Sequence, residues 1–248
     1  MSAPLSGRTA LVTGGARRVG AAIVRALHAA GANVLIHCHH SLEDAQTLAR
    51  ELQEARADSS AVAVADLLDC AALPRLIGAA EERFGALHLL VNNASSFYPT
   101  PLGRITLSDW EDLMGTNLRA PLFLAQAAAP LLARAGGSVV NIADIHAQRP
   151  LRDHLVYCAA KAGLIMLTRA LARELAPAVR VNAIAPGSIL WPESGMDEAR
   201  KQRILERTPL GRHGEPEDIA RAVLYLTAYA PFVTGQVLAV DGGRSIAW

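Results

Sequence analysis

The sequence of 248 residues has few of the features that mark secreted or membrane-spanning proteins. Its 3 cysteines are odd in number and scattered, which favours reduced thiols in a cytoplasmic protein over a disulfide framework. The first residues, MSAPLSGRTALVTG, contain no basic segment followed by an apolar core and so do not resemble a signal peptide. The longest apolar run, around 120–133, is too short for a bilayer and is interrupted by Pro121, Gln126 and Pro130. We therefore expect a cytoplasmic protein that does not enter a membrane.

Charge of one sign is not in excess either. Lys and Arg together number 24 and Asp and Glu 23, which leaves a formal net charge of +1. No overall field favours nucleic acid or an anionic membrane as a partner, so a small-molecule ligand is expected. The length suits one α/β domain, and no linker, repeat or low-complexity segment divides residues 1–248.

Short apolar runs alternate along the chain with longer stretches that place apolar residues at helical spacing. The runs predict strands, buried on both faces, at 9–13, 33–38, 61–65, 87–92, 137–143, 180–185 and 236–240. The longer stretches predict helices at 18–30, 42–56, 70–84, 107–133, 155–176 and 216–227. This alternation predicts a single doubly wound Rossmann-type α/β domain, with a parallel seven-stranded sheet and helices on both faces.

Polar and glycine-bearing segments follow six of the predicted strands, where a sheet of this kind binds its ligands. They are TGGARRVG at 13–20, HCHHS at 37–41, Asp66, NNASSFYPTP at 92–101, ADIH at 143–146 and APGSILWPESG at 185–195. Their common position predicts one ligand site along the carboxyl edge of the sheet.

The second predicted strand ends without an Asp or Glu that could accept the ribose 2′-hydroxyl of NAD. His39, His40 and Ser41 stand there instead and can hydrogen-bond a phosphate, so NADPH is the expected cofactor. Histidine and cysteine also suggest a transition metal. Alternate side chains of a strand point to opposite faces and do not converge easily, so we expect no metal site.

Tyr157 and Lys161 lie four residues apart on a predicted helix and therefore share one face. A nearby ammonium favours phenolate, so we expect it to lower the tyrosine pKa and allow proton transfer near neutrality. The alternative is an incidental pair on a solvated helix.

Several motifs together resemble the short-chain dehydrogenase/reductase family over essentially the whole chain. They are TG followed by Gly20, NNA at 92–94, Tyr157 with Lys161, PG at 186–187 and DGG at 241–243. Three further features resemble the pteridine reductases within it: Arg18 in place of a glycine, NNASSFYPTPL at 92–102, and Asp144 where most relatives carry serine. The resemblance implies NADPH-dependent reduction of dihydropterins, a homotetramer and a substrate loop near 186–210.

The resemblance also implies roles for individual residues. Asp144, Tyr157 and Lys161 would be catalytic, Lys161 would hold the nicotinamide ribose, and Asn117 would order water for a proton relay. The implied cofactor-binding residues are Gly14, Arg17, Arg18, Val19, His39, His40, Ser41, Asp66, Asn93, Ala94, Ser95, Tyr157, Lys161, Pro186, Gly187 and Ser188. The implied substrate contacts are Arg18, Ser95, Phe97, Asp144, Tyr157 and Trp191.

For four of these residues the implied role is specific. Arg17 would face the adenosine 2′-phosphate, whereas Arg18 would reach the pyrophosphate and a pterin oxygen through its planar guanidinium. Phe97 would stack on the pterin ring, and Trp191 would close over the ligand. Alternatives remain for each: two solvated arginines, an ordinary core phenylalanine, and an aromatic that anchors the loop to the body.

Asp144 argues against carbonyl chemistry, because an ionised carboxylate cannot donate a hydrogen bond to a developing oxyanion. It can instead hold the phenol of Tyr157 for donation to a ring nitrogen. The alternatives are that Asp144 caps a loop or pairs with Arg149, and that Asn117 bonds a neighbouring backbone group.

His146, Asp153 and His154 are interpreted as surface polar residues without a role. Two other functions stay open: a short-chain reductase of another carbonyl, such as a 3-oxoacyl thioester, and a non-catalytic NADPH-binding sensor.

Overall fold

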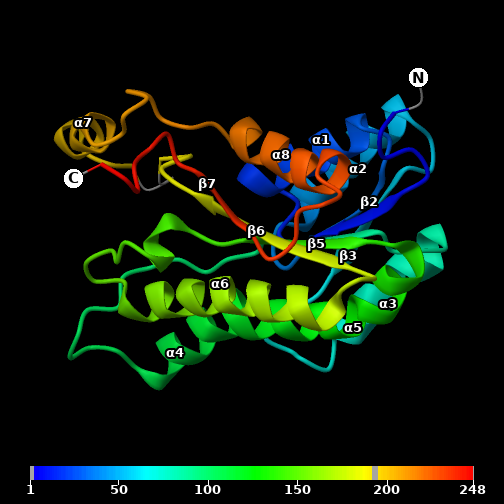
Figure 1. Ribbon diagram of the computed structural model, residues 1–248, viewed down its shortest axis with the longest axis horizontal. Coiled ribbons are helices and arrows are strands. Elements are labelled where there is room, and N and C mark those ends of the chain that lie inside the picture. The colour runs from blue at the N-terminus through cyan, green and yellow to red at the C-terminus, as the bar shows by residue number, and fades with distance from the viewer. Residues whose placement is uncertain (1–2, 192–194, 248) are drawn as a thin grey trace.

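The computed structural model describes residues 3–191 and 195–247, and it contains a seven-stranded sheet with helices on both faces (Figure 1). The strands are β1 Thr9–Val12, β2 Asn33–Cys38, β3 Ser60–Val64, β4 Leu89–Asn92, β5 Ser138–Ile142, β6 Arg180–Pro186 and β7 Val237–Val240. Their order is β3-β2-β1-β4-β5-β6-β7, and every neighbouring pair is parallel. The predicted fold class is confirmed, and the chain order reverses between β1 and β4.

The helices divide between the two faces of this sheet (Figure 1). One face carries α1 Arg18–Ala29, α2 Leu42–Ala55 and α8 Pro216–Leu224, and the other carries α3 Leu73–Phe84, α4 Leu107–Met114, α5 Ala120–Ala135 and α6 Leu155–Leu175. Helix α7, Glu198–Glu206, has nine residues and lies apart at one end of the molecule, near the C-terminus. This arrangement leaves the carboxyl ends of the strands free of covering helices.

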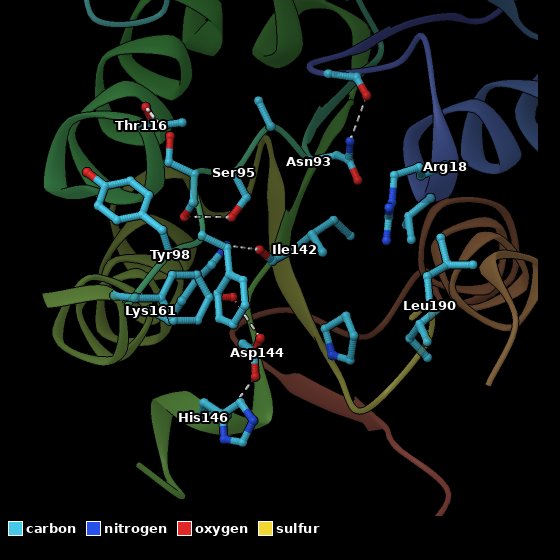
Figure 2. Close-up of a pocket in the computed structure, with 18 of the residues that line it drawn as sticks. Arg18, Asn93, Ser95, Tyr98, Thr116, Ile142, Asp144, His146, Lys161 and Leu190 are labelled. Atoms are coloured by element: carbon cyan, nitrogen blue, oxygen red, sulfur yellow. Dashed lines mark hydrogen bonds between the residues drawn. The ribbon is translucent and has the colours of Figure 1, made fainter. Parts of the chain in front are cut away.

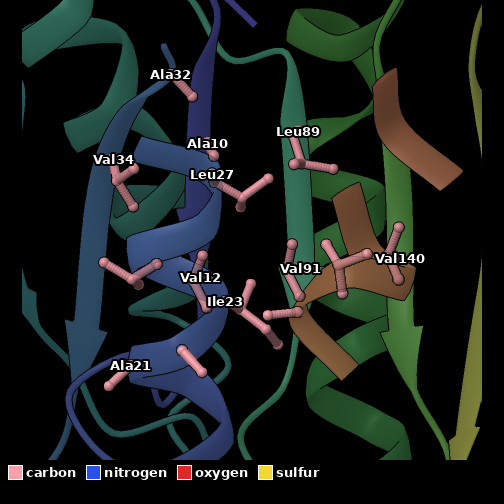
Figure 3. Close-up of a cluster of buried hydrophobic side chains, with 14 of the residues drawn as sticks. Ala10, Val12, Ala21, Ile23, Leu27, Ala32, Val34, Leu89, Val91 and Val140 are labelled. Carbon is pink, nitrogen blue, oxygen red and sulfur yellow. The ribbon is translucent and has the colours of Figure 1, made fainter. Parts of the chain in front are cut away.

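Alternation along each central strand produces two apolar cores, one on each side of the sheet. In β1, Ala10 and Val12 belong to the core under α1, whereas Leu11 belongs to the core under α5. Figure 3 shows Ile23 and Leu27 of α1 lying against Val12 and the residues of β4. Each such buried aliphatic side chain contributes about 1.5–3 kcal/mol of transfer free energy, which fixes the register of strands and helices.

Burial on both faces holds for the central strands but not for the edges. Val64 at the end of β3 is 55% exposed, and Leu238 in β7 is 38% exposed. Each edge strand has only one neighbour, so helices cover it less completely than they cover β1 or β4. The prediction of complete burial is therefore wrong for β3 and β7.

Periodicity predicted one helix over 107–133, and the structure has two. A π-helical turn at Gly115–Arg119 separates α4 from α5. Pro121 stands in the first turn of α5 and has no N–H to continue the regular ladder. A π-helical turn at Tyr225–Tyr229 likewise follows α8.

Helix α7 lies inside the segment expected to be a substrate loop, and its sequence EARKQRILE lacks an apolar face long enough to predict it. Its beginning is set by Asp197, whose side chain accepts a hydrogen bond from the backbone N–H of Arg200 at 2.8 Å.

Among the described helices, α6 has the length and apolar composition that a membrane span requires. It packs here against β6, α4 and the turn at Ile145–Ala147. The same properties are those of a helix in a protein core.

Candidate active site

A large cavity of about 1430 Å³ lies at the carboxyl ends of the strands, across the point where the strand order reverses. The segments that follow β1, β2, β3, β4, β5 and β6 all contribute to its lining. Figure 2 shows side chains from these segments converging on the cavity. The ligand site expected from the ends of the strands is therefore a single hollow.

The structure brings nearly all of the sequence-predicted site residues to this cavity. Those lining it are Gly14, Arg17, Arg18, Val19, His39, His40, Asp66, Asn93, Ala94, Ser95, Phe97, Asp144, Tyr157, Lys161, Pro186, Gly187, Ser188 and Trp191. Ser41 and Asn117 are not part of the lining. Ser41 precedes the first residue of α2, and Asn117 is fully buried behind the lining residues.

Asp144 directly contacts the phenol of Tyr157. The tyrosine hydroxyl donates to Asp144 Oδ2 at 2.7 Å, while Asp144 Oδ1 accepts from the backbone N–H of His146 at 2.7 Å (Figure 2). The second bond caps the short 3-10 helix Ile145–Ala147, so two interpretations of Asp144, the phenol partner and the loop cap, hold together. Arg149 donates from Nε to the Ser245 carbonyl at 3.0 Å.

The expectation that Lys161 lowers the tyrosine pKa is wrong. Burial, followed by the charge of Asp144 and the hydrogen bond to it, raises the pKa of Tyr157 well above 10, and the Ser95 hydroxyl opposes this only in part. The ammonium lies 5.7 Å from the centre of the Tyr157 ring and donates to the Ile142 carbonyl at 2.9 Å. Tyr157 is therefore a protonated phenol at neutral pH, able to act as an acid.

Lys161 is itself buried, and this burial lowers its pKa to about 8, with Asp144 opposing the shift. A group with that pKa is mostly charged at pH 7. The site therefore combines a cationic amine, a neutral phenol and the carboxylate side chain that bonds the phenol.

Asn117 sits in the π-helical turn and is hydrogen-bonded at both ends of its amide. Its Nδ2 donates to the carbonyls of Ser96 at 3.0 Å and Leu113 at 2.9 Å, and its Oδ1 accepts from the Ser95 hydroxyl at 2.6 Å. The backbone-bonding alternative is thus the observed one. Through Ser95, Asn117 positions a hydroxyl beside the phenol of Tyr157.

The loop between β1 and α1 is held by groups from two neighbouring strands. Gly14 N–H donates to His37 Nδ1 at 3.1 Å, and Asn93 Nδ2 donates to the carbonyls of Thr13 at 2.9 Å and Gly14 at 3.0 Å. A Cβ at Gly20 would overlap the Gly14 carbonyl oxygen, which explains the glycine there. Sequence reasoning missed His37, for which the only signal was its place near the carboxyl end of a ligand-binding strand.

Arg17 and Arg18 occupy the start of α1, whose first turn contains no acidic residue. Arg18 has φ of 53°, a left-handed conformation that explains why a glycine is common at this position in the family. Its guanidinium donates to the Trp191 carbonyl at 3.3 Å across the cavity mouth. Arg17 Nε lies 3.8 Å from Asp44 Oδ2, a half-exposed pair that contributes little to stability.

Phe97 is 53% exposed, so its interpretation as an ordinary core residue is wrong. Its ring packs edge-to-face on Tyr157 at 4.8 Å between centroids and stacks on His154 at 4.7 Å. His154 is only 8% exposed and also lines the cavity, which corrects its interpretation as a surface residue. No single-sequence pattern distinguishes such a histidine.

Trp191 stacks on His213 at 4.0 Å between ring centroids, which favours its role as an anchor of the loop. Its side of the cavity also includes Met196, Asp197 and Arg200, beyond residues 192–194 that lie outside the described chain. Ser96 and Asp112, joined at 3.1 Å, and Tyr98 form a polar group at the opposite side that sequence reasoning missed. Burial and the neighbouring Asp112 raise the pKa of Tyr98 to about 12.

Within residues 3–191 and 195–247, no cluster of three or more His, Cys, Asp or Glu side chains could hold a metal ion. The site fits a nicotinamide dinucleotide better, by the chemistry of its lining. A glycine-bearing loop at a helix N-terminus suits a pyrophosphate, and Arg17, His39 and His40 offer donors where β2 has no carboxylate.

Comparison with known proteins agrees with this geometry. A family model described as enoyl-(acyl carrier protein) reductase matches residues 14–245. The chain belongs to the short-chain dehydrogenase/reductase family. It is therefore an oxidoreductase, and reductases of this family use NAD(H) or NADP(H).

Individual relatives of this short-chain reductase carry different names. A putative ketoacyl reductase 2 of the granaticin polyketide synthase from Streptomyces violaceoruber is 39% identical, over 96% of each chain. Pteridine reductase 1 of Leishmania tarentolae is 36% identical, also over 96% of each. A 3-oxoacyl-(acyl-carrier-protein) reductase of Staphylococcus aureus is 34% identical over 95% of this chain and 97% of its own.

Proposed function

We propose that this short-chain reductase uses NADPH to reduce dihydropterins to tetrahydropterins. The observation that carries the proposal is the hydrogen bond from the Tyr157 hydroxyl to Asp144 Oδ2, 2.7 Å long, beside the exposed ring of Phe97. A phenol held by a carboxylate next to an accessible aromatic face suits a flat, nitrogen-containing ring better than a simple ketone.

Reduction of the dihydropterin ring adds hydride to carbon and a proton to nitrogen of one C=N bond. When bound, the nicotinamide cofactor supplies the hydride. Tyr157 supplies the proton, since its raised pKa keeps the phenol protonated at neutral pH. Asp144 orients the hydroxyl and helps to return a proton to it after transfer.

Cofactor choice follows from the end of β2 and the start of α1. Arg17, His39 and His40 line the cavity there, and none of them would attract a free ribose 2′-hydroxyl as a carboxylate does. A phosphate at that place gains charge-assisted hydrogen bonds. We expect NADPH to bind at least about tenfold more tightly than NADH, or roughly 1.4 kcal/mol.

A second candidate is reduction of a 3-oxoacyl thioester. The names of two relatives, at 39% and 34% identity, support it. Against it stands Asp144, because an ionised carboxylate beside the substrate oxygen repels the developing oxyanion.

The deciding experiment measures NADPH oxidation with dihydrobiopterin, dihydromonapterin, dihydrofolate, a 3-oxoacyl thioester and a simple ketone in parallel. We expect the dihydropterins to have the highest kcat/KM. A dominant rate with the thioester or ketone would replace the pterin proposal, and any turnover excludes a non-catalytic sensor. Which dihydropterin dominates identifies the C6 substituent that the site prefers.

Cofactor binding is measured separately by titration of NADPH and NADH. Arg17→Ala should weaken NADPH binding and leave NADH nearly unchanged, and equal dissociation constants in the unmodified protein would refute the preference. The family likeness also leads us to propose a cytoplasmic homotetramer, for which light scattering gives the mass.

A further inference from the structure

A second hollow, of about 560 Å³, adjoins the active-site cavity. It lies where α7 runs beside the C-terminal segment, at one end of the molecule (Figure 1). The described residues that line it are Arg152, Arg200, Arg203, Ile204, Arg207 and Arg244. Arg200, Ile204 and Arg244 line the active-site cavity as well, so the two hollows share a wall. We refer to these six residues as the arginine annex.

The arginine annex owes its composition to three separate segments. Arg200 and Arg203 lie three residues apart on α7, and Arg207 follows the last residue of that helix, four positions after Arg203. Arg244 comes from the C-terminal segment, and its Nη1 donates to the Ile204 carbonyl at 3.0 Å, which ties that segment to α7. Arg152 comes from the loop before α6.

No acidic side chain is among the described lining residues of the annex. Two acidic side chains of α7 have hydrogen-bond partners of their own: Glu198 accepts from Lys201 Nζ at 2.6 Å, and Glu206 from Gln202 Nε2 at 3.3 Å. Asp241 accepts from the backbone N–H groups of Gly243 and Ser245. Asp153 approaches Arg152 only to 3.9 Å, on the exposed surface.

Arg200, Arg203, Arg207 and Arg152 are exposed and Arg244 is partly buried. Guanidinium groups gathered on one surface repel one another, and an anion bound among them relieves that repulsion. Burial, and after it the charge of Arg207, lower the pKa of Arg244, with Asp241 opposing. Planar guanidinium groups bind carboxylates and phosphates through two parallel hydrogen bonds. The arrangement thus suits a ligand with several negative charges.

We propose that the arginine annex binds an anionic tail of the substrate whose reactive group lies at Tyr157. The recognised chemistry is carboxylate or phosphate, joined to the substrate by a linker that passes Arg200 and Ile204. The inference rests on the proposed function in one respect, that the substrate reacts at Tyr157. It does not depend on whether the reduced group is a pterin ring or a carbonyl. Two sources can supply such a tail: the glutamates of a folate-type pterin, or the phosphates of a coenzyme A thioester.

Matched substrate pairs test the proposal. For pterins, KM is compared between dihydrofolate carrying three glutamates and dihydrobiopterin, which has no anionic tail. For thioesters, acetoacetyl coenzyme A is compared with acetoacetyl-N-acetylcysteamine, which has no phosphate. In the pair that turns over, we expect the anionic member to have a KM about tenfold lower at low ionic strength, an advantage that shrinks as salt rises.

A double variant, Arg203→Gln with Arg207→Gln, tests whether the annex causes that preference. Both residues line the annex and neither lines the active-site cavity. We divide the KM of the member without an anionic tail by the KM of the anionic member. In the double variant we expect this ratio to fall to about one-fifth of its value in the unmodified protein, or less. Arg75→Gln is the matched control, since Arg75 is exposed on α3 and lines neither hollow, and it should leave the ratio unchanged.

A binding measurement independent of turnover separates this proposal from the proposed function. Calorimetry with p-aminobenzoyl-triglutamate and with phosphopantetheine uses the two tails without a reducible group. Binding of either tail that the double variant weakens supports the annex, even if no pterin is reduced and the proposed function fails. Absence of binding by both tails, or equal KM values within the active pair, would overturn the annex while leaving pterin reduction standing.

Discussion

Among single residues, Asp144 contributes most to the proposal that this chain reduces a pterin instead of a carbonyl compound. One carboxylate oxygen accepts the phenol of Tyr157 and the other accepts the backbone N–H of His146. A serine at this position could not replace both bonds at once, because its single hydroxyl does not reach both partners as two carboxylate oxygens do. Asp144 therefore both shapes the turn after β5 and holds the phenol of Tyr157, the proposed proton donor.

The first prediction concerns this residue. Asp144→Ser should lower kcat for dihydropterin by about 10²-fold or more, the usual effect of losing a proton-transfer group, while NADPH binding persists. The measurement is the pH profile of kcat/KM together with a cofactor titration. A variant that turns over dihydropterin at the unmodified rate across the pH range would contradict the Asp144–Tyr157 relay.

Phe97 leads to the second prediction. Its exposed ring packs against Tyr157 and His154, so Phe97→Ala should remove the aromatic face on which we expect the substrate ring to stack. Stacking contributes on the order of 1 kcal/mol beyond area burial, so KM for dihydropterin should rise about fivefold or more. Phe232→Ala is the matched control, because Phe232 is fully exposed and does not line the cavity. If both variants had the same KM, Phe97 would not contact the substrate.

Among the elements, the loop between β1 and α1 shows how neighbouring strands position a ligand-binding turn. His37 of β2 accepts from Gly14 N–H, and Asn93 Nδ2, after β4, donates to the carbonyls of Thr13 and Gly14. Burial lowers the pKa of His37, although its bond to the Ala65 carbonyl opposes this, so the ring is neutral and keeps an acceptor nitrogen.

The third prediction tests this support. His37→Phe removes the acceptor for Gly14 N–H, so the loop loses its fixed position and the Kd for NADPH should rise about tenfold. His88→Phe is a close control, because His88 Nδ1 accepts from the backbone N–H of Thr9 at 3.0 Å, at the other end of β1. We expect both variants to lower the Tm but only His37→Phe to weaken NADPH binding. Equal loss of affinity in the two would mean that general destabilisation causes it.

For the whole molecule, two buried and two partly buried histidines make the free energy of unfolding depend on pH. Burial lowers the pKa of His28, His37, His88 and His213 below the ordinary 6.5. Between their folded values and 6.5 the unfolded chain binds more protons than the folded one, so the free energy of unfolding rises with pH. That stability is complete above pH 6.5 and is lost as the pH falls below it.

The fourth prediction follows from this sign. The free energy of unfolding, measured by urea denaturation, should decrease steadily from pH 6.5 to pH 5 and change less from pH 6.5 to 7.5. The carboxyl groups with lowered pKa values, including Asp109 and Asp218, contribute at lower pH and do not obscure this window. A constant or increasing free energy of unfolding on acidification to pH 5 would contradict it.

Local pattern was sufficient to predict most of the elements and the edge of the sheet at which the site lies. Apolar runs such as NVLIHC at β2 match the observed strand, because burial on both faces leaves a continuous apolar signature. The pattern was insufficient at 107–133, where a π-helical turn interrupts the helix, and at α7, whose residues are mostly charged. In both places backbone geometry depends on contacts that periodicity does not record.

The edge of the sheet that binds the ligand could be inferred from the chain alone, since ligand-binding residues follow strands in a parallel sheet. The family and its cofactor class came from the resemblance of its motifs, such as NNA at 92–94 and Tyr157 with Lys161. The proton state of Tyr157 could not be inferred from the chain, because burial and the approach of Asp144 outweigh the charge of Lys161, four residues away. The support from His37, the stacking of His154 on Phe97 and the arginine annex also arise only when distant segments pack together. Electrostatic and packing energies depend on distances in space, and folding sets these between residues far apart in the chain.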